Sequence, residues 1–141
     1  MSSIQSKPNP KLFSNFDVSD QVFYESENSL GIVNLKPIVN GHVLIIPKRN
    51  SIQKLSQLDE IELIDLFKTV QIVSKQLEII YESNSLTISI QYLSMEFLEN
   101  VFEEEKVIKI KQVPHLHVHI LPRQPNDFKQ NDEVSKPNPS T

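Results

Sequence analysis

Histidine alternates with aliphatic residues through three repeats near one end of the chain. The stretch runs Pro114-His115-Leu116-His117-Val118-His119-Ile120-Leu121-Pro122-Arg123. Successive side chains of a β-strand point to opposite faces, so an extended segment would place the three imidazoles on one face and the aliphatic side chains on the other. The chain has only four histidines, and three of them lie here. We therefore predict a strand over 115–122 that presents a row of imidazoles.

Two of the roles open to such a row fit the pattern poorly. Histidines that only satisfy local hydrogen bonds on a polar strand face would not need strict alternation. A metal site is the second role, because two histidines two residues apart can share Zn²⁺ or Cu²⁺. The outer pair of a straight strand is roughly 13–14 Å apart, however, and the chain contains no cysteine. We predict no metal site.

Nucleophilic catalysis on a phosphate ester is the third role. A neutral imidazole is a good nucleophile near pH 7, because its ordinary pKa of about 6.5 leaves much of it unprotonated. Neighbouring imidazoles resist being charged together, which keeps the central one neutral. A covalent histidine intermediate then divides one difficult displacement into two easier ones. The pattern favours His117 as the nucleophile, with its neighbours donating hydrogen bonds to phosphate and fixing its tautomer.

Length and charge limit the class of protein. A chain of 141 residues is typical of a single domain. The net charge of −4 repels a phosphate backbone, so we expect no polymeric nucleic acid as a partner. We also expect no membrane association, since no apolar run approaches the length of a membrane span and the N-terminus lacks a signal peptide pattern. The absence of cysteine fits a cytoplasmic location, with the nucleus as the alternative.

Local patterns predict the elements that would position the histidine strand. Strand-forming residues and alternation predict four further strands, over 22–24, 29–35, 42–47 and 86–91. Apolar residues at three- and four-residue spacing predict one long helix over about 56–81, capped by Ser56. A shorter amphipathic helix is predicted within 95–102. Polar, proline-containing ends predict a disordered N-terminal tail over 1–11 and a polar C-terminal tail over 124–141.

Several motifs together resemble one known family. The run His115-Leu116-His117-Val118-His119-Ile120-Leu121 is similar to the signature of the histidine triad (HIT) superfamily of nucleotide hydrolases and transferases. Asn34-Leu35-Lys36-Pro37-Ile38-Val39 and Ser85-Leu86-Thr87-Ile88-Ser89-Ile90-Gln91 resemble two further blocks of its fragile histidine triad branch. Leu121-Pro122-Arg123 with Asp127-Phe128 resembles the segment that follows the triad in that branch.

This resemblance implies a fold, an assembly and a reaction. The fold would be α+β, with an antiparallel sheet of about five strands, one long helix and a shorter second helix. The domain would span 12–123, and two copies would join their sheets in a homodimer. The reaction would be the cleavage of diadenosine triphosphate to AMP and ADP. Magnesium or manganese would arrive with the substrate rather than be bound by the protein.

Roles for individual residues also follow from the resemblance. His117 would attack the α-phosphorus and His119 would hydrogen-bond the scissile phosphate, while His115 and His42 would orient the central imidazole. The resemblance assigns the remaining contacts with substrate, to the ribose and the phosphates, to Asn34, Gln91, Gln112 and Val113.

One segment departs from the family pattern. Residues 92–114 form a longer connection than the branch has, and they contain no glycine, since the chain's only glycines are Gly31 and Gly41. We interpret 92–114 as an atypical inserted loop beside the active site. It leaves two alternatives open: a weakly active or inactive module that binds nucleotides in signalling, and a nucleoside phosphoramidase of the same superfamily.

Overall fold

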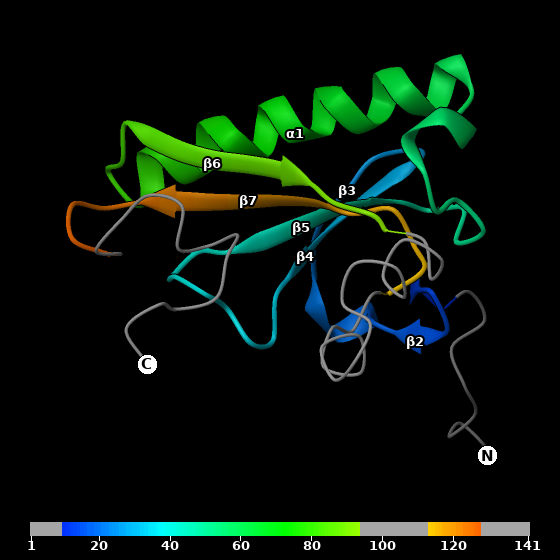
Figure 1. Cartoon of the computed structure of the whole chain (residues 1–141), viewed down its shortest axis with the longest axis horizontal. Coiled ribbons are helices and arrows are strands. Elements are labelled where there is room, and N and C mark those ends of the chain that lie inside the picture. The colour runs from blue at the N-terminus through cyan, green and yellow to red at the C-terminus, as the bar shows by residue number, and fades with distance from the viewer. Residues whose placement is uncertain (1–9, 94–112, 128–141) are drawn as a thin grey trace.

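A five-stranded antiparallel sheet covered by one long helix makes up the fold (Figure 1). The structure is a computed structural model that describes residues 10–93 and 113–127. Four predictions therefore lie outside the described residues: the second helix, most of the inserted loop over 92–114, most of the two tails, and the position of Gln112. The predicted α+β class is confirmed in its main parts, which are the sheet and the long helix.

The main sheet has the strand order β3-β4-β5-β7-β6, with every neighbouring pair antiparallel. Its strands, in chain order, are β3 (Val22–Glu25), β4 (Ser29–Val33), β5 (Val43–Pro47), β6 (Ser85–Ile90) and β7 (Val118–Arg123). Because β7 lies between β5 and β6, the histidine-bearing segment enters the middle of the sheet rather than an edge.

Both faces of β5 are buried, as its nearly continuous apolar sequence predicts. Val43 and Ile45 join the core on the helix side, where Val118 and Ile120 of β7 also lie. Leu44 belongs to a second apolar cluster on the opposite face of the sheet, with Val18, Leu30, Ile32 and Ile46. Since Leu44 pairs with His119 across the β5–β7 ladder, His119 faces away from the helix.

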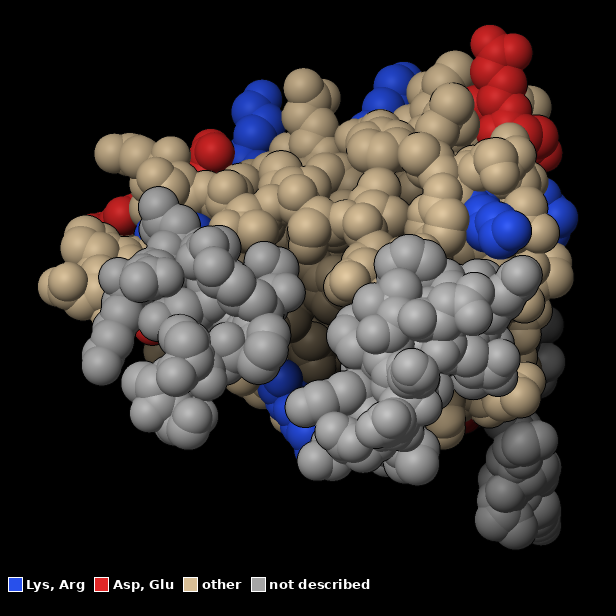
Figure 2. All heavy atoms as spheres, in the orientation of Figure 1, with Lys and Arg blue, Asp and Glu red and all other residues tan. Residues whose placement is uncertain are grey.

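The long helix α1 (Glu60–Ile80) begins later than predicted. Its N-cap is Asp59, whose carboxylate accepts a 2.8 Å hydrogen bond from the backbone N–H of Glu62. Ser56 instead lies in a separate 3₁₀ turn, η3 (Leu55–Gln57). Acidic side chains gather on the surface where α1 begins (Figure 2), which suits the positive end of the helix dipole.

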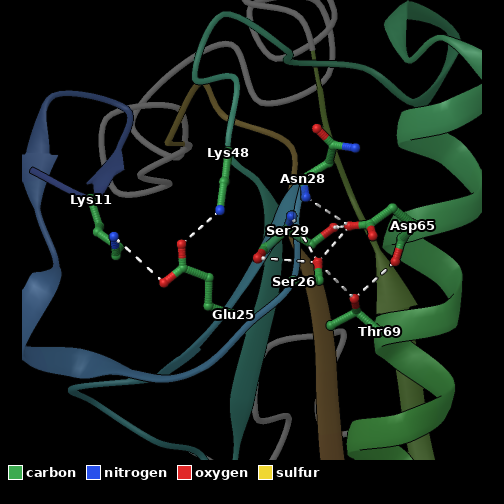
Figure 3. Close-up of polar contacts among 8 residues, drawn as sticks. All are labelled: Lys11, Glu25, Ser26, Asn28, Ser29, Lys48, Asp65 and Thr69. Carbon is green, nitrogen blue, oxygen red and sulfur yellow. Dashed lines mark hydrogen bonds and ion pairs between the residues drawn. The ribbon is translucent and has the colours of Figure 1, made fainter. Parts of the chain in front are cut away.

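A small hairpin that the sequence analysis did not predict precedes the sheet. It consists of β1 (Leu12–Phe13) and β2 (Phe16–Asp17), which pair with each other in a two-stranded sheet and lead into the 3₁₀ turn η2 (Ser19–Gln21). Lys11, assigned to the disordered tail by sequence, is held here by a bond from its N–H to the Ser19 hydroxyl. Lys11 and Lys48 also flank Glu25 of β3 (Figure 3).

The turn between β3 and β4 is fastened to α1 by one carboxylate (Figure 3). Asp65 accepts hydrogen bonds from the hydroxyls of Ser26 at 2.5 Å and Ser29 at 2.7 Å, and from the backbone N–H of Asn28 at 3.2 Å. These donors hold the pKa of Asp65 below its ordinary value despite its partial burial. The contacts fix α1 over the sheet.

Two predicted strands have different ends in the structure. β4 stops at Val33, because the Asn34 side chain accepts a hydrogen bond from the Lys36 N–H and turns the chain. The histidine strand begins at Val118 rather than at residue 115, so only His119 of the triad lies in β7. Among the described residues, no helix is both long enough and apolar enough to cross a membrane.

Candidate active site

Four histidines lie along the paired strands β5 and β7, on the face of the sheet opposite α1. His119 lies in β7, His42 comes directly before β5, and His115 and His117 lie in the segment that leads into β7. The ring centroids of His117 and His119 are 5.0 Å apart, and those of His119 and His42 are 5.2 Å apart. The buried alternation of Leu116, Val118 and Ile120 anchors this segment in the core beneath them.

A relay of hydrogen bonds determines the tautomers of His42 and His119. The backbone N–H of Ile38 donates to Nδ1 of His42 at 3.2 Å, so the proton of a neutral His42 lies on Nε2. Nε2 of His42 is 3.0 Å from Nδ1 of His119 and donates to it. The proton of His119 is therefore on Nε2, where it is available to donate to a ligand.

The other two histidines have complementary tautomers. Nδ1 of His115 accepts a 2.7 Å hydrogen bond from the Ser14 N–H, and its Nε2–H donates to the Pro47 carbonyl at 2.8 Å. Nδ1–H of His117 donates to the His115 carbonyl at 2.7 Å. A neutral His117 therefore keeps an unprotonated Nε2, whose lone pair is the nucleophile that phosphoryl chemistry needs.

Burial keeps all four imidazoles neutral. It lowers the pKa of His42, His115 and His117, and it lowers that of His119 to about 4 with help from the nearby His117 and His42. His115 and His42 are almost fully buried, whereas His117 and His119 are partly exposed. The predicted row of three thus consists of two accessible rings, His117 and His119, and one buried ring, His115, while His42 adds a second buried ring from outside the row.

These pKa values predict a loss of stability in mild acid. Each imidazole titrates lower in the folded protein than in the unfolded chain, so the unfolded chain binds more protons as the pH falls below about 6.5. The free energy of unfolding is expected to decline from pH 6.5 toward pH 4, with His119 contributing on the order of 2 kcal/mol. Urea titrations at pH 7 and pH 5 should show a smaller decline for His119→Gln, and equal declines would contradict the assignment.

The other predicted site residues lie around this group at different distances. The Asn34 amide nitrogen is 3.3 Å from the ring nitrogens of His42. Gln91 is exposed and follows directly after β6, and because Ser89 pairs with His119 and Ile90 with Val118, it arrives at the level of His117. Val113 accepts a 2.8 Å hydrogen bond from the His115 N–H and makes the turn into the triad.

The sequence analysis missed several residues that hold the site. Phe13 packs its ring 5.3 Å from both His115 and His117, measured between centroids. Ser14, Pro47 and Asn50 contribute backbone or amide groups around His115. Apolar residues on both sides of Ser14-Asn15 are a hairpin signal that could have revealed Phe13 and Ser14. Pro47 and Asn50 carry no comparable signal.

A bound metal ion finds no ready-made site in the described part of the chain. No group of three or more His, Asp or Glu side chains there is arranged to hold one. The four nitrogens that interlink Asn34, His42 and His119 are engaged with one another. The expectation that magnesium or manganese arrives with a substrate stays a prediction.

Comparison with known proteins identifies the family of this arrangement. The sequence profile of the HIT domain matches residues 15–126, which include the whole sheet, α1 and all four histidines. The chain belongs to the HIT domain family. Within that family, it is 40% identical over 127 residues to the bis(5'-nucleosyl)-tetraphosphatase (asymmetrical) of Schizosaccharomyces pombe. It is also 40% identical over 114 residues to the bis(5'-adenosyl)-triphosphatase of Saccharomyces cerevisiae.

These alignments cover most of this HIT chain but less of its relatives. They include 90% and 81% of the chain, and 62% and 49% of the two relatives. The crystal structure of the Caenorhabditis elegans NitFhit protein superimposes with a TM-score of 0.69 at 34% identity, over 92% of this chain and 28% of that one. A Plasmodium falciparum diadenosine triphosphate hydrolase has the same fold, with a TM-score of 0.69 at 22% identity.

Proposed function

We propose that the chain is a dinucleoside polyphosphate hydrolase that cleaves diadenosine triphosphate to AMP and ADP through a nucleotidyl-histidine intermediate. The observation that carries this proposal is the tautomer of His117. Its Nδ1–H is engaged by the His115 carbonyl at 2.7 Å, which leaves Nε2 free as a lone pair. The ring of His117 lies 5.0 Å from that of His119 between centroids, and the Nε2–H of His119 is a donor suited to a phosphate oxygen.

The reaction has two balanced steps. Nε2 of His117 attacks the α-phosphorus, forms a nitrogen–phosphorus bond and breaks the bond to the bridging oxygen, so that ADP leaves. The Nε2–H of His119 donates a hydrogen bond to the scissile phosphate as charge moves to the leaving oxygen. Water then attacks the same phosphorus, breaks the nitrogen–phosphorus bond and releases AMP with a proton.

The names of the relatives support this substrate class. Both curated relatives are hydrolases of dinucleoside polyphosphates by name, and each is 40% identical to this chain. The chain spans 62% or less of the length of those relatives, so the activity comes to it as a proposal. Asn34 beside His42 and Gln91 at the level of His117 are the groups that we assign to the ribose and the phosphates.

Hydrolysis in oxygen-18 water tests the proposal. We expect one AMP and one ADP from each diadenosine triphosphate, with the label in AMP alone, since water attacks the α-phosphorus held by His117. Label in ADP would contradict attack at the α-phosphorus. Nucleotide binding without turnover would favour a signalling module, and faster cleavage of a nucleoside phosphoramidate would favour a phosphoramidase. The cytoplasm, with the nucleus as the alternative, remains the proposed compartment.

We also propose that two copies form a homodimer through the open edge of β6. Among the residues that the structure describes, β6 pairs only with β7, and its other edge has no strand partner there. Ile88 on that strand is 48% exposed. Leu63 and Phe67 of α1 are also exposed. Both lie about 200° around the helix axis from Asp65, which points to the β3–β4 end of the sheet, so they lie on the side of the helix away from that end.

Sedimentation of the purified chain tests this dimer. We expect twice the monomer mass for the wild type and the monomer mass for Ile88→Glu, because a buried unpaired carboxylate strongly opposes association. Ile79→Glu is the control: it places the same charge at an exposed isoleucine that lies on α1, outside the proposed interface, and should leave the dimer intact. A monomeric wild type, or equal dissociation of both variants, would contradict the proposal.

A further inference from the structure

The last residue of β5 and the loop that follows it contact the triad segment (residues 115–119) at several points. The Pro47 carbonyl accepts from Nε2–H of His115 at 2.8 Å, and the Ile52 carbonyl accepts from the Leu116 N–H at 2.8 Å. A third contact is indirect: the Asn50 amide donates to the Ser14 carbonyl at 2.8 Å. Residues 47–52 therefore support the part of the triad segment that sheet pairing does not hold.

That support matters because the nucleophile lies outside β7. The ladder with β5 includes Val118, His119 and Ile120, and the ladder with β6 also begins at Val118. His115 and His117 depend on other contacts for their orientation. A misplacement of about 1 Å at a nucleophile costs rate, because attack requires a narrow range of distances and angles.

Asn50 stands at the start of a chain of hydrogen bonds that ends at His117. Its side chain fixes the carbonyl of Ser14, and the N–H of the same Ser14 donates to Nδ1 of His115 at 2.7 Å. The His115 carbonyl then accepts from Nδ1–H of His117 at 2.7 Å. The Ser14 N–H places the proton of the His115 ring on Nε2, and the His115 carbonyl places the proton of His117 on Nδ1. Asn50 therefore acts on the positions of Ser14 and His115, from which the orientation of His117 follows.

The backbone of Ser14 shows why a separate residue is needed to hold it. Its φ of +58° lies in the left-handed region, which costs a residue with a side chain about 1 kcal/mol or more. Such a conformation persists only where surrounding contacts fix it. The bonds to Asn50 and His115 engage both polar groups of the Ser14 backbone and do so.

The hairpin also contributes an apolar wall to the same histidines. Phe13 meets His117 edge to face, with an interplanar angle of 86° and a centroid distance of 5.3 Å. It packs against His115 at the same centroid distance in a tilted geometry. Within the described residues the hairpin strands pair only with each other, so side-chain contacts attach this wall to the domain, and the bonds to Asn50 and His115 are the ones that reach the triad segment.

We infer that Asn50 is a positioning residue for the nucleophile: through Ser14 it holds His115, and with it the carbonyl that keeps His117 in the orientation required for attack. This inference rests on the proposed function for its kinetic consequences and on geometry alone for the tautomer of His115. Asn50 touches neither reacting histidine directly, so its removal should change the rate of the chemical step more than the binding of nucleotide.

Two substitutions at Asn50 test the inference, with Asn84→Ala as the matched control. Asn50→Ala deletes the donor, and Asn50→Asp keeps the shape while facing the Ser14 carbonyl with a second acceptor. Asn84 is an exposed asparagine in the turn between α1 and β6, at the other end of the sheet (Figure 1). We expect kcat to fall about three- to tenfold in both Asn50 variants, with KM within about twofold of wild type.

Nitrogen-15 NMR of the imidazoles provides the readout that a merely structural role would not change. We expect His115 protonated on Nε2 and His117 on Nδ1 in the wild type and in Asn84→Ala, and mixed tautomers for His115 in the Asn50 variants. Unchanged tautomers, or a fall in melting temperature with kcat intact, would overturn the inference. A wild type that does not hydrolyse diadenosine triphosphate would refute the proposed function, and the NMR result would still decide the role of Asn50.

Discussion

Replacing His117 with asparagine is expected to reduce hydrolysis of diadenosine triphosphate by about 1,000-fold or more. The asparagine amide can take the place of Nδ1–H and still donate to the His115 carbonyl, which His117 reaches at 2.7 Å. The variant lacks only the Nε2 lone pair, so it removes the nucleophile without leaving a buried carbonyl unpaired. Rates of AMP and ADP release under saturating substrate measure the effect.

The controls for this variant are its stability and its affinity. We expect the melting temperature of His117→Asn to stay close to that of the wild type, because His117 is partly exposed and its hydrogen bond is replaced. Binding of a non-hydrolysable dinucleotide should change little, since the assigned binding groups are elsewhere. Turnover similar to wild type would show that His117 is not the nucleophile.

Replacing Gly41 with alanine is expected to destabilise the fold by about 3 kcal/mol. Gly41 has a φ of +88°, which residues with a side chain rarely adopt. A Cβ atom there would lie 2.7 Å from Cε2 of Tyr81 and 2.8 Å from Cγ of Pro122, so the new methyl group meets the end of α1 and the β7 strand together. His42 follows directly, and the relay to His119 would shift with it.

The other glycine of the chain is the matched control. A Cβ atom on Gly31 would lie 3.0 Å from the tip of Phe23, a ring that is 45% exposed and has room to move. We expect Gly31→Ala to cost about 1 kcal/mol or less, because its backbone needs no left-handed conformation. Urea denaturation of both variants decides the matter, and equal losses would mean that crowding at Gly41 is not the cause.

Periodicity predicted the main elements because each one depends on a local pattern. The continuous apolar run of β5 and the three- and four-residue spacing in α1 both identify buried surface, which the structure shows. The ends were harder to predict, since caps depend on competition between nearby polar residues. Asp59 formed the capping box with Glu62, and so the helix began there rather than at Ser56.

The candidate site was predictable in composition and less so in arrangement. Alternation correctly placed Leu116, Val118 and Ile120 in the core, and it placed the histidines on the opposite side. It could not show that His115 would be buried, because that burial comes from Phe13 and from bonds to Ser14 and Pro47, which are distant in sequence. Tautomers depend on such partners and have no signature in a single strand.

Rapid quenching followed by mass spectrometry tests the central claim most directly. Wild-type protein mixed with diadenosine triphosphate and quenched in alkali, where phosphorus–nitrogen bonds of histidine survive, should carry one adenylyl group. Peptide mapping should locate this group on His117, with none in His117→Asn. An adduct on another residue, or turnover with no adduct at any quench time, would contradict a nucleotidyl-histidine mechanism at this site.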